Sequence, residues 1–346
     1  MTVDAEQRSR LLRTKLVALT RGSRASDGFD APEGDLATDA VRVGAITAVR
    51  LDDTAYTLAE TASAGALASA MLWAHRQGAT RVVLFADDHP GDLARWAGYF
   101  HLGGGPVDVR AVVGAGSESA TASPMPAAAS APDAPDALLE QLRDAGLEVV
   151  VEHGVVRGEL LGLEVARLVV WPSEHGGDDE LHLEAGVGRF DRDAVAAAHP
   201  DEAPAEALAR AVHAVRAHRY QGAPAHPIQM LSRERWLRAD LIADPARIGA
   251  RRLAPISMTT EADGLRDAHP AAAAGVDLDG RPLVVVCSSG VDLALVPLAA
   301  DTRELVDPEA RLVLALPERD HHVATSTLVG LLRRPAELAV VAPGWS

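Results

Sequence analysis

Three glutamates occupy positions where acidic side chains are unusual, inside runs that are otherwise apolar. Glu159 and Glu164 lie in GELLGLEVARLVV, and Glu184 lies in DELHLEAGVG. Carboxylate oxygens gathered at one point bind a hard divalent cation such as Mg²⁺ or Mn²⁺, and the bound ion activates water for attack on a phosphodiester. Metal-dependent hydrolysis is therefore the first chemistry that these residue types suggest.

The same glutamates also have a structural interpretation, as ion-pair partners within a β ribbon. A turn over residues 172–179 would place Trp171 opposite Glu180, and Arg167 opposite Glu184, on antiparallel strands. A register shifted by one residue would bring Glu184 against an apolar side chain instead. The residues alone leave both interpretations open.

The segment around these glutamates has the pattern of a helix, a β ribbon and further helices. Glycine follows the first apolar-periodic run and marks the end of a helix, and the runs after it alternate as strands do. The predicted elements are a helix over 137–146, a strand over 147–153, a ribbon over 158–171 and 180–185, and helices over 206–219 and 230–242.

This order of elements resembles the core of the PD-(D/E)xK nuclease superfamily, in particular its Holliday-junction-resolvase-like members. The resemblance rests on the rhythm of LRDAGLEVVVEHGVVRGELLGLEVARLVV and DELHLEAGVG. It implies a restriction-endonuclease-like αβββα unit with a mixed sheet and a divalent ion held by Glu159 and Glu184, with helical Glu140 as a third acid. It also implies that Glu159, Glu164 and Glu184 would be the catalytic residues.

The sequence departs from that superfamily at the positions that carry catalysis. The family aspartate, two residues after the Gly-Glu glutamate, falls at Leu161, and the lysine, two residues after the acid of the returning strand, falls at Gly186. Lys15 is the only lysine in the chain. An arginine supplies positive charge but does not readily give up a proton near neutral pH.

The incomplete catalytic set leads us to expect a non-catalytic binding or assembly protein that contains a degenerate nuclease-like domain and needs no cofactor. The alternative is a divalent-metal-dependent DNA nuclease of the PD-(D/E)xK type, which would use Mg²⁺ or Mn²⁺ at Glu159, Glu164 and Glu184. The whole chain also resembles a family of uncharacterised actinobacterial conserved proteins with GLEVAR and GVGRFDR blocks, and this resemblance supplies no mechanism.

The net charge of −16 opposes general binding to nucleic acid, which depends on neutralising phosphates. Residues 210–252 are a local exception, with nine arginines against three acids. These arginines could contact nucleic acid, pair with the protein's own acids or meet an acidic partner, and the overall charge favours the last two. We expect a protein partner or self-association, with four candidate contact residues: Arg216, Arg219, Arg233 and Trp236.

A chain of 346 residues that is 48% apolar is long enough for two or three domains. Strands and helices alternate near both ends of the chain, which predicts the α/β class with mainly parallel βαβ units there. The predicted divisions are an N-terminal α/β domain over 1–113, a flexible Ala/Ser/Pro linker over 114–136, the nuclease-like unit with its arginine-rich helices over 137–252, and a C-terminal α/β segment over 253–346.

Segments 79–113 and 310–341 share one order of strand, acidic loop with histidine, helix and strand. Either an internal duplication or two ordinary βαβ units would produce this likeness. Cys287 is the only cysteine, which excludes an intrachain disulfide and suits a small buried residue. The chain shows no apolar run of about 18 residues and no apolar signal core, so we expect a cytoplasmic protein without a membrane span.

Overall fold

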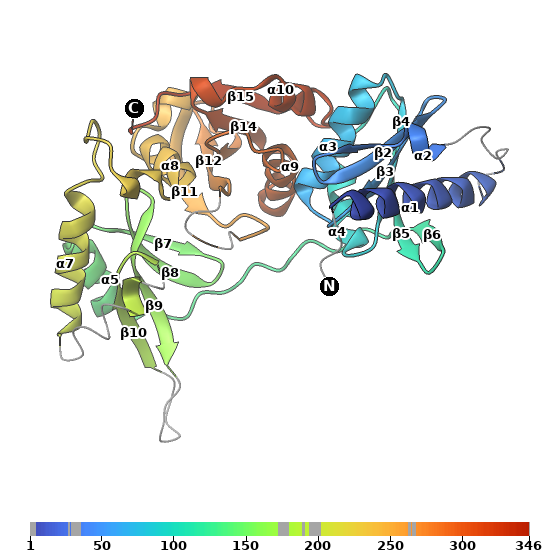
Figure 1. Ribbon diagram of the computed structural model, residues 1–346. Helices are drawn as coiled ribbons and strands as arrows, with labels where there is room; N and C mark the ends of the chain where they lie inside the picture. The colour runs from blue at the N-terminus through green and yellow to red at the C-terminus, as the bar shows by residue number, and fades with distance from the viewer. Residues whose placement is uncertain are drawn as a thin grey trace. The chain divides into compact units, whose positions relative to one another are not determined.

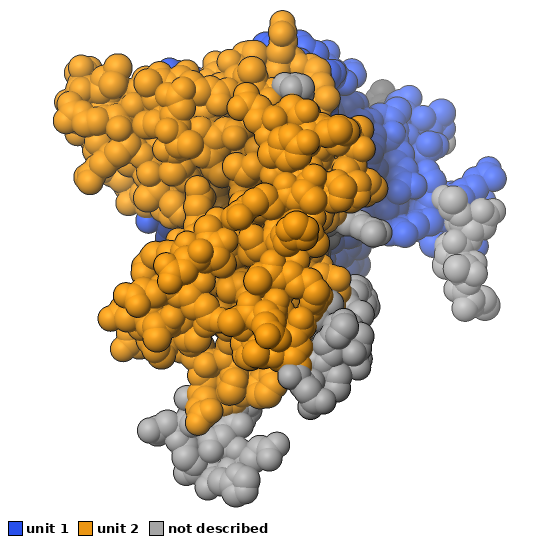
Figure 2. Space-filling model, turned by 90° about the vertical axis from the view of Figure 1, so that its left-hand side faces the viewer, with its two compact units in different colours: residues 1–125, 291–305, 321–337 blue, residues 126–290, 306–320, 338–346 orange. Residues whose placement is uncertain are grey.

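The computed structural model describes residues 5–26, 28, 36–171, 180–188, 191–193, 202–261, 264 and 268–345. The fold belongs to the α/β class, as the sequence predicts. The chain forms two compact units, coloured separately in Figure 2. Unit 1 contains residues 1–125, 291–305 and 321–337, and unit 2 contains residues 126–290, 306–320 and 338–346.

Unit 1 is built on a six-stranded sheet in the order β1-β2-β3-β4-β5-β6 (Figure 1). Strands β3, β4 and β5 are parallel, and the other neighbours are antiparallel. The strands are β1 (Val41–Val43), β2 (Ile46–Leu51), β3 (Thr54–Ala59), β4 (Arg81–Ala86), β5 (Val107–Val113) and β6 (Gly116–Ser119). The helices of this part of the chain are α1 (Ala5–Ser26), α2 (Leu36–Asp39), α3 (Ala64–Arg76) and α4 (Pro90–Ala97).

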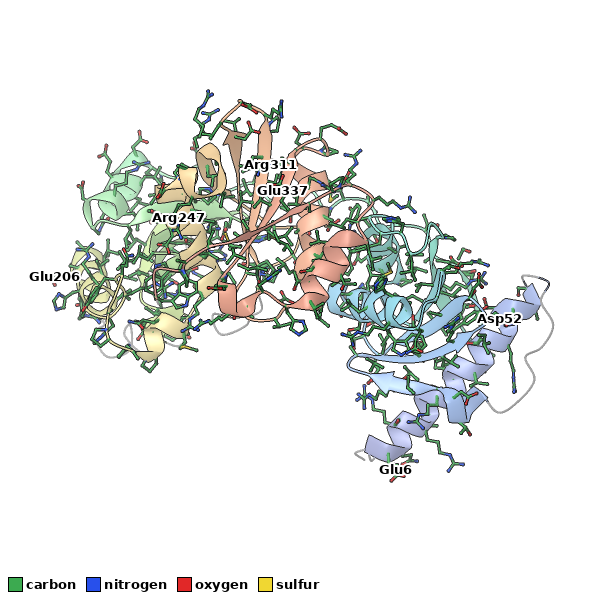
Figure 3. The ribbon with its side chains drawn as sticks, turned by 90° about the horizontal axis from the view of Figure 1, so that it is seen from above. Glu6, Asp52, Glu206, Arg247, Arg311 and Glu337 are labelled. Carbon is green, nitrogen blue, oxygen red and sulfur yellow. The ribbon has the colours of Figure 1, made fainter. Side chains whose placement is uncertain are left out.

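The packing of α1 on the sheet gives unit 1 one of its apolar cores. Leu16 and Leu19 of α1 join Tyr56, Val83 and Phe85 of the strands in one buried cluster. Near the end of the helix, Arg24 donates a 3.1 Å hydrogen bond to Asp52 in the turn between β2 and β3. Figure 3 labels Asp52. Helix α1 is therefore joined to the sheet by apolar contacts and by this polar one.

A buried aspartate in a later part of the chain completes unit 1. Asp301 lies on α9 (Leu295–Val306) and is fully buried. It accepts hydrogen bonds from Arg95 at 3.0 Å, from the Trp96 indole at 3.0 Å and from the Tyr99 hydroxyl at 2.7 Å. These contacts with the region of α4 place a segment remote in sequence in the same unit as residues 1–125.

The first sheet of unit 2 is a four-stranded meander in the order β10-β9-β8-β7, and its three described ladders are antiparallel. Apolar residues of α5 and α7 pack against the strands in one core, which includes Leu142, Val165, Leu208 and Val212. The elements are α5 (Asp136–Asp144), β7 (Glu148–Glu152), β8 (Val155–Leu160), β9 (Leu163–Trp171), β10 (Glu180–Ala185) and α7 (Pro204–Arg216).

The antiparallel meander differs from the mixed sheet that the nuclease resemblance implied. Strands β7 and β8 are joined by His153 and Gly154, and β8 and β9 by Leu161 and Gly162. Two-residue connections can join only antiparallel neighbours, because a parallel neighbour needs a crossover of a dozen or more residues. The register predicted for the ribbon is confirmed, since Trp171 pairs with Glu180 and Arg167 pairs with Glu184.

The second sheet of unit 2 has the order β11-β12-β13-β14-β15. Strands β11, β12 and β13 are antiparallel, and β13 and β14 are parallel. Its core contains Leu237 and Leu241 of α8 with Val285, Cys287 and Val313 of the strands. The elements are α8 (Arg233–Ala243), β11 (Ala250–Ile256), β12 (Ala271–Asp277), β13 (Pro282–Cys287), β14 (Arg311–Leu316) and β15 (Glu337–Val340), with α10 (Val323–Gly330) between the last two strands. Three short 3₁₀ turns lie at Pro227–Met230, Pro245–Ile248 and Glu318–Asp320.

The two ends of the chain repeat one connectivity. Apart from the four-residue α2 and two 3₁₀ turns, both runs, α1 to β5 and α8 to β15, have the same order of elements. Each has a helix, three antiparallel strands, a helix, a parallel strand, a helix and a last strand. The segments 79–113 and 310–341, whose likeness is visible in the sequence, are the last three elements of each copy. The two copies form separate sheets.

The predicted domain limits differ from the observed units in two places. Residues 116–119, placed in the linker, form β6 and pair with β5, and residues 120–135 contain neither helix nor strand. Residues 291–305 and 321–337 belong to unit 1, although the sequence places them in a C-terminal segment. Among the described helices, none is both long and apolar enough to cross a membrane.

The turn between β8 and β9 gives a test of how unit 2 is packed. Leu161 and Gly162 both have positive φ, at 47° and 73°, as a two-residue type I′ hairpin requires. A Cβ added at Gly162 would lie 2.2 Å from the carbonyl carbon of Arg235 in α8. We predict that Gly162→Ala lowers the free energy of unfolding by about 3 kcal/mol or more, since strain at positive φ adds to overpacking.

Gly280→Ala is the matched control for this substitution. Gly280 has φ of 83°, and a Cβ there would meet nothing within 4 Å. It should therefore lose only about 1–2 kcal/mol from backbone strain. Urea unfolding of both variants measures the difference, and equal losses would contradict the close packing of the turn on α8.

Candidate functional site

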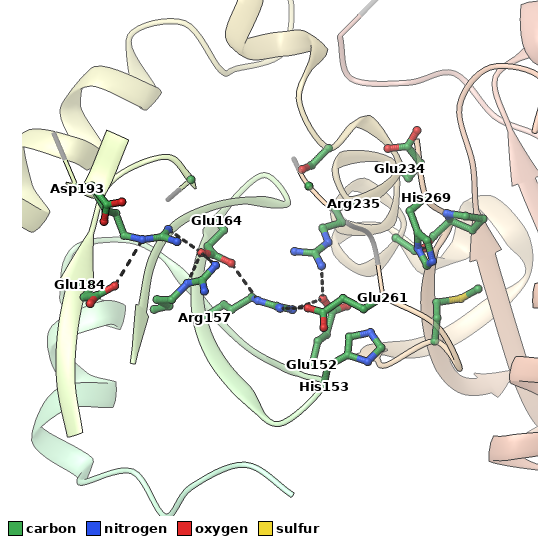
Figure 4. Close-up of a pocket in the computed structure, with 18 residues that line it drawn as sticks. Glu152, His153, Arg157, Glu164, Glu184, Asp193, Glu234, Arg235, Glu261 and His269 are labelled. Carbon is green, nitrogen blue, oxygen red and sulfur yellow. Dashed lines mark hydrogen bonds and ion pairs between the residues drawn. The ribbon is translucent and has the colours of Figure 1, made fainter. Parts of the chain in front are cut away.

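A cavity of about 510 Å³ in unit 2 is lined by two of the three sequence-predicted glutamates, Glu164 and Glu184 (Figure 4). It lies where the β7–β10 sheet meets α8 and the residues that follow β11. The arginines that line it are Arg157, Arg167, Arg192 and Arg235. The acids that line it are Glu152, Glu164, Glu184, Asp193, Glu234 and Glu261.

Glu159 lies behind the cavity wall and is bound by two guanidinium groups of α8. It is 1% exposed, and its carboxylate oxygens accept from Arg235 Nη1 at 3.1 Å and from Arg238 Nη2 at 2.9 Å. Burial raises the pKa of Glu159, and the charges of Arg238 and Arg235 oppose this rise. Both oxygens of the carboxylate are therefore used in the fold.

Glu152, at the end of β7, shares the same arginines. Its Oε2 lies 2.9 Å from Arg235 Nη2 and 3.1 Å from Arg157 Nη1, and its Oε1 accepts from Arg238. Burial alone would raise the pKa of Glu152, but the charges of Arg238 and Arg235 outweigh burial and hold it below its ordinary value. Charge-assisted hydrogen bonds therefore join the meander to α8. They run from Arg235 and Arg238 to the two carboxylates of Glu152 and Glu159.

Glu164 has three guanidinium groups around one carboxylate. Arg157 Nε lies 3.0 Å from its Oε2, while Arg167 Nη2 and Arg192 Nη1 approach its Oε1 at 2.6 Å and 2.9 Å. The Glu164 side chain is 3% exposed. Figure 4 shows this cluster on the sheet side of the cavity, with Glu184 beyond it.

Local backbone features place these side chains. The ladder between β8 and β9 shifts register between Gly158 and Glu159, which is the irregularity expected of a β-bulge and re-aims the side chain that follows. The carbonyl of Leu161, in the turn with positive φ, accepts from Arg219 Nε at 3.1 Å and Nη2 at 2.8 Å. Arg219 therefore supports the strained turn that leads from Glu159 to Glu164.

The structure does not bring the three sequence-predicted glutamates to a common point with open oxygens. Glu159 is bound to α8, and Glu164 is bound to Arg157, Arg167 and Arg192. Glu184 is only 36% exposed and faces Arg192 Nε at 3.6 Å, rather than forming the ion pair predicted with Arg167. Within the described ranges, no group of three or more His, Cys, Asp or Glu residues has the arrangement of a metal site. Glu140, the acid implied on the preceding helix, is exposed on α5.

Two of the four residues proposed for partner binding are buried and serve the fold. Arg219 and Trp236 are each 1% exposed, and the Arg219 guanidinium lies 4.4 Å from the centre of the Trp236 ring. The partner-binding assignment of these two residues is therefore corrected, because neither reaches the surface. Arg216 is exposed and donates to the Ala145 carbonyl at 3.2 Å, and the partly exposed Arg233 lies 5.5 Å from the centre of the Trp345 ring.

Sequence patterns do not identify several residues of the site. Arg192, which stands in a polar stretch typical of a solvated helix start, is buried instead. Glu152 ends the short strand β7 and Arg157 lies within β8, and neither position in the sequence indicates a buried, paired charge. The excess of arginine over residues 210–252 was the available signal, and Arg235 and Arg238 from that segment do pair with the protein's own acids.

No protein-family model, curated protein or solved structure matches the chain. The geometry of the site itself therefore carries the functional interpretation. It offers a polar concavity whose buried carboxylates are paired and whose guanidinium groups are held in fixed positions.

The buried pairing of Glu159 predicts a large effect of removing its charge. Glu159→Gln should lower the free energy of unfolding by about 3 kcal/mol or more, because the fully buried Arg238 would keep its charge with less compensation. Glu202→Gln is the control, since Glu202 pairs with Arg210 at the surface and should change stability by less than about 1 kcal/mol. Urea unfolding at pH 7 gives both values, and a small effect of Glu159→Gln would mean that this carboxyl is already protonated in the folded state.

Proposed function

We propose that this protein is a non-catalytic binding protein and that the charged cavity of unit 2 is its binding site. The observation that carries the proposal is the pairing of the buried glutamates. The carboxylates of Glu159 and Glu164 are committed to guanidinium groups, whereas a catalytic divalent ion needs carboxylate oxygens that are free to coordinate it.

A divalent cation at Glu164 would also meet unfavourable electrostatics. It would stand within a few ångströms of the guanidinium groups of Arg157, Arg167 and Arg192, and binding would require at least one of them to leave the carboxylate. Separating a buried ion pair leaves an uncompensated charge, which costs about 3–5 kcal/mol. This cost opposes a catalytic metal ion at Glu164 and favours a ligand-binding site over metal-dependent hydrolysis.

The cavity has the properties of a small-molecule site. Its volume of about 510 Å³ falls in the range of roughly 300–1,000 Å³ that is typical for such sites. Its polar groups come from several elements, including β8, β9, α8 and the residues before β12, so a ligand would contact both sheets of unit 2. Binding of a ligand would therefore depend on how the two sheets pack against each other.

The wider setting of this function follows from composition. A cytoplasmic protein with net charge −16 is poorly suited to nucleic acid, so a protein partner or a second copy of the chain is the macromolecular contact we propose. The middle unit, in this proposal, has a degenerate catalytic set, and its antiparallel sheet departs from the mixed sheet of the nuclease core. Arg216 and Arg233 keep their place as candidate contacts because both reach the surface.

The proposal predicts no nuclease activity and no specific metal binding. Purified protein incubated with branched, single-stranded and duplex DNA and Mg²⁺ or Mn²⁺ should cleave no more than its Glu184→Ala variant. Addition of Mg²⁺ or Mn²⁺ should shift the melting temperature of the parent protein by less than about 1 °C relative to a buffer of equal ionic strength. The reason is that only an ion bound to the folded state stabilises it. Cleavage that needs Mn²⁺ or Mg²⁺ and is lost in Glu184→Ala would overturn the proposal in favour of the nuclease.

A further inference from the structure

Three guanidinium groups gather at the Glu164 end of the cavity, which Glu184 and Asp193 also line. Arg157, Arg167 and Arg192 share one carboxylate, and two of them share a single oxygen of it, Oε1. Arg157 has further acids as partners, namely Glu152 and Glu261. Arg167 has Glu164 as its only ion-pair partner in the described part of the chain, whereas Arg192 also faces Glu184.

Arg192 is held at this point by the chain that follows β10. The Gly186 carbonyl accepts from Arg192 Nη1 at 3.4 Å, and the Val187 N–H donates to Asp191 at 2.7 Å. The Arg192 side chain is 7% exposed and lines the cavity. Burial, followed by the charge of Arg167, lowers the pKa of Arg192, which is the effect expected where guanidinium groups crowd together.

Arg167 and Arg192 both line the cavity, and each keeps N–H groups that are not used in these contacts. Arg167 uses Nε and Nη2 on Glu164, and Arg192 uses Nη1 on Glu164 and Nε on Glu184. Within the described ranges, Arg167 Nη1 and Arg192 Nη2 make no hydrogen bond. Two guanidinium groups that line one cavity and keep unused N–H donors are suited to binding phosphate and carboxylate groups.

We propose that the Glu164 end of the cavity binds the oxyanion of a small ligand, a phosphate or carboxylate group, between Arg167 and Arg192. This inference rests on the proposed binding function and names the ligand class for it. The oxyanion would accept hydrogen bonds from Arg167 Nη1 and Arg192 Nη2, the N–H donors of these two cavity-lining arginines that the described part of the chain does not use.

The opposite end of the cavity indicates the rest of the ligand. Glu234 and His269 line that end, and Glu234 accepts a 2.7 Å hydrogen bond from Ser289. Carboxylate oxygens there accept hydrogen bonds, which suits hydroxyl or amino groups. The ligand class is therefore a small phosphorylated or carboxylated molecule that carries hydroxyl or amino groups at its other end.

Isothermal titration with two probes tests this site on the full chain. Inorganic phosphate and acetate are titrated separately at pH 7 against a background of NaCl at equal ionic strength, so that general screening is held constant. Saturable binding of phosphate, or of acetate, supports the oxyanion site and identifies which group it takes. If phosphate and acetate both give the same heat as NaCl and neither titration saturates, the inference is overturned.

Arg167→Gln is the principal variant, because the Arg167 side chain is 31% exposed and its loss should leave the fold intact. It should weaken binding of the saturating probe about tenfold or more, as expected for loss of a charge-assisted bond. The matched control is Arg210→Gln, which removes an arginine paired with a glutamate away from this cavity. Equal affinity in the two variants would overturn the assignment.

Glu164→Gln provides a second test that does not depend on losing a function. It removes the carboxylate that competes with the anion, so the folded variant should bind the probe more tightly than the parent chain and gain more in melting temperature from it. Unchanged or weaker binding contradicts the site. Failure of these experiments would leave the absence of nuclease activity untouched, so the two proposals can fail separately.

Discussion

Buried carboxylates that need counter-charges are the constraint on which the architecture of unit 2 depends. Glu152, Glu159 and Glu164 lie on a sheet whose other face packs against α5 and α7, and ionised acids cannot remain buried without partners. Arg235 and Arg238 of α8 supply that charge from the next part of the fold. The requirement for pairing therefore holds the meander against the second sheet and defines the wall of the cavity between them.

This constraint also explains why arginine replaces lysine throughout the site. A guanidinium presents several N–H donors in a fixed plane, so Arg157 can bind Glu152, Glu164 and Glu261 at once. An ammonium group has a compact charge and could not join three acids held at different points of the sheet in this way. A guanidinium does not readily give up a proton near neutral pH, so these arginines are better suited to holding a shape and recognising a ligand than to acid–base catalysis.

Much of the fold follows from local patterns. The apolar runs of β4, β13 and β14, and the register that pairs Arg167 with Glu184, can be read from alternation and turn length. The site could not be read in the same way, because its partners are remote in sequence. Nothing near Glu159 indicates that Arg238 will meet it, and nothing near Arg95 indicates that Asp301 will complete unit 1. Arg192 shows the limit most clearly, since a polar stretch that is typical of a solvated helix start buries its arginine against Glu164.

A double-mutant cycle between Glu159 and Arg238 tests the central claim most directly. Glu159→Gln, Arg238→Met and the double variant are unfolded in urea, and the coupling energy is taken from the four free energies of unfolding. If the buried pair joins the meander to α8, each single variant strands a charge and the double variant recovers part of the loss, with coupling of about 2 kcal/mol or more. Losses that add to within about 0.5 kcal/mol would contradict the account, because the two groups would then be acting independently.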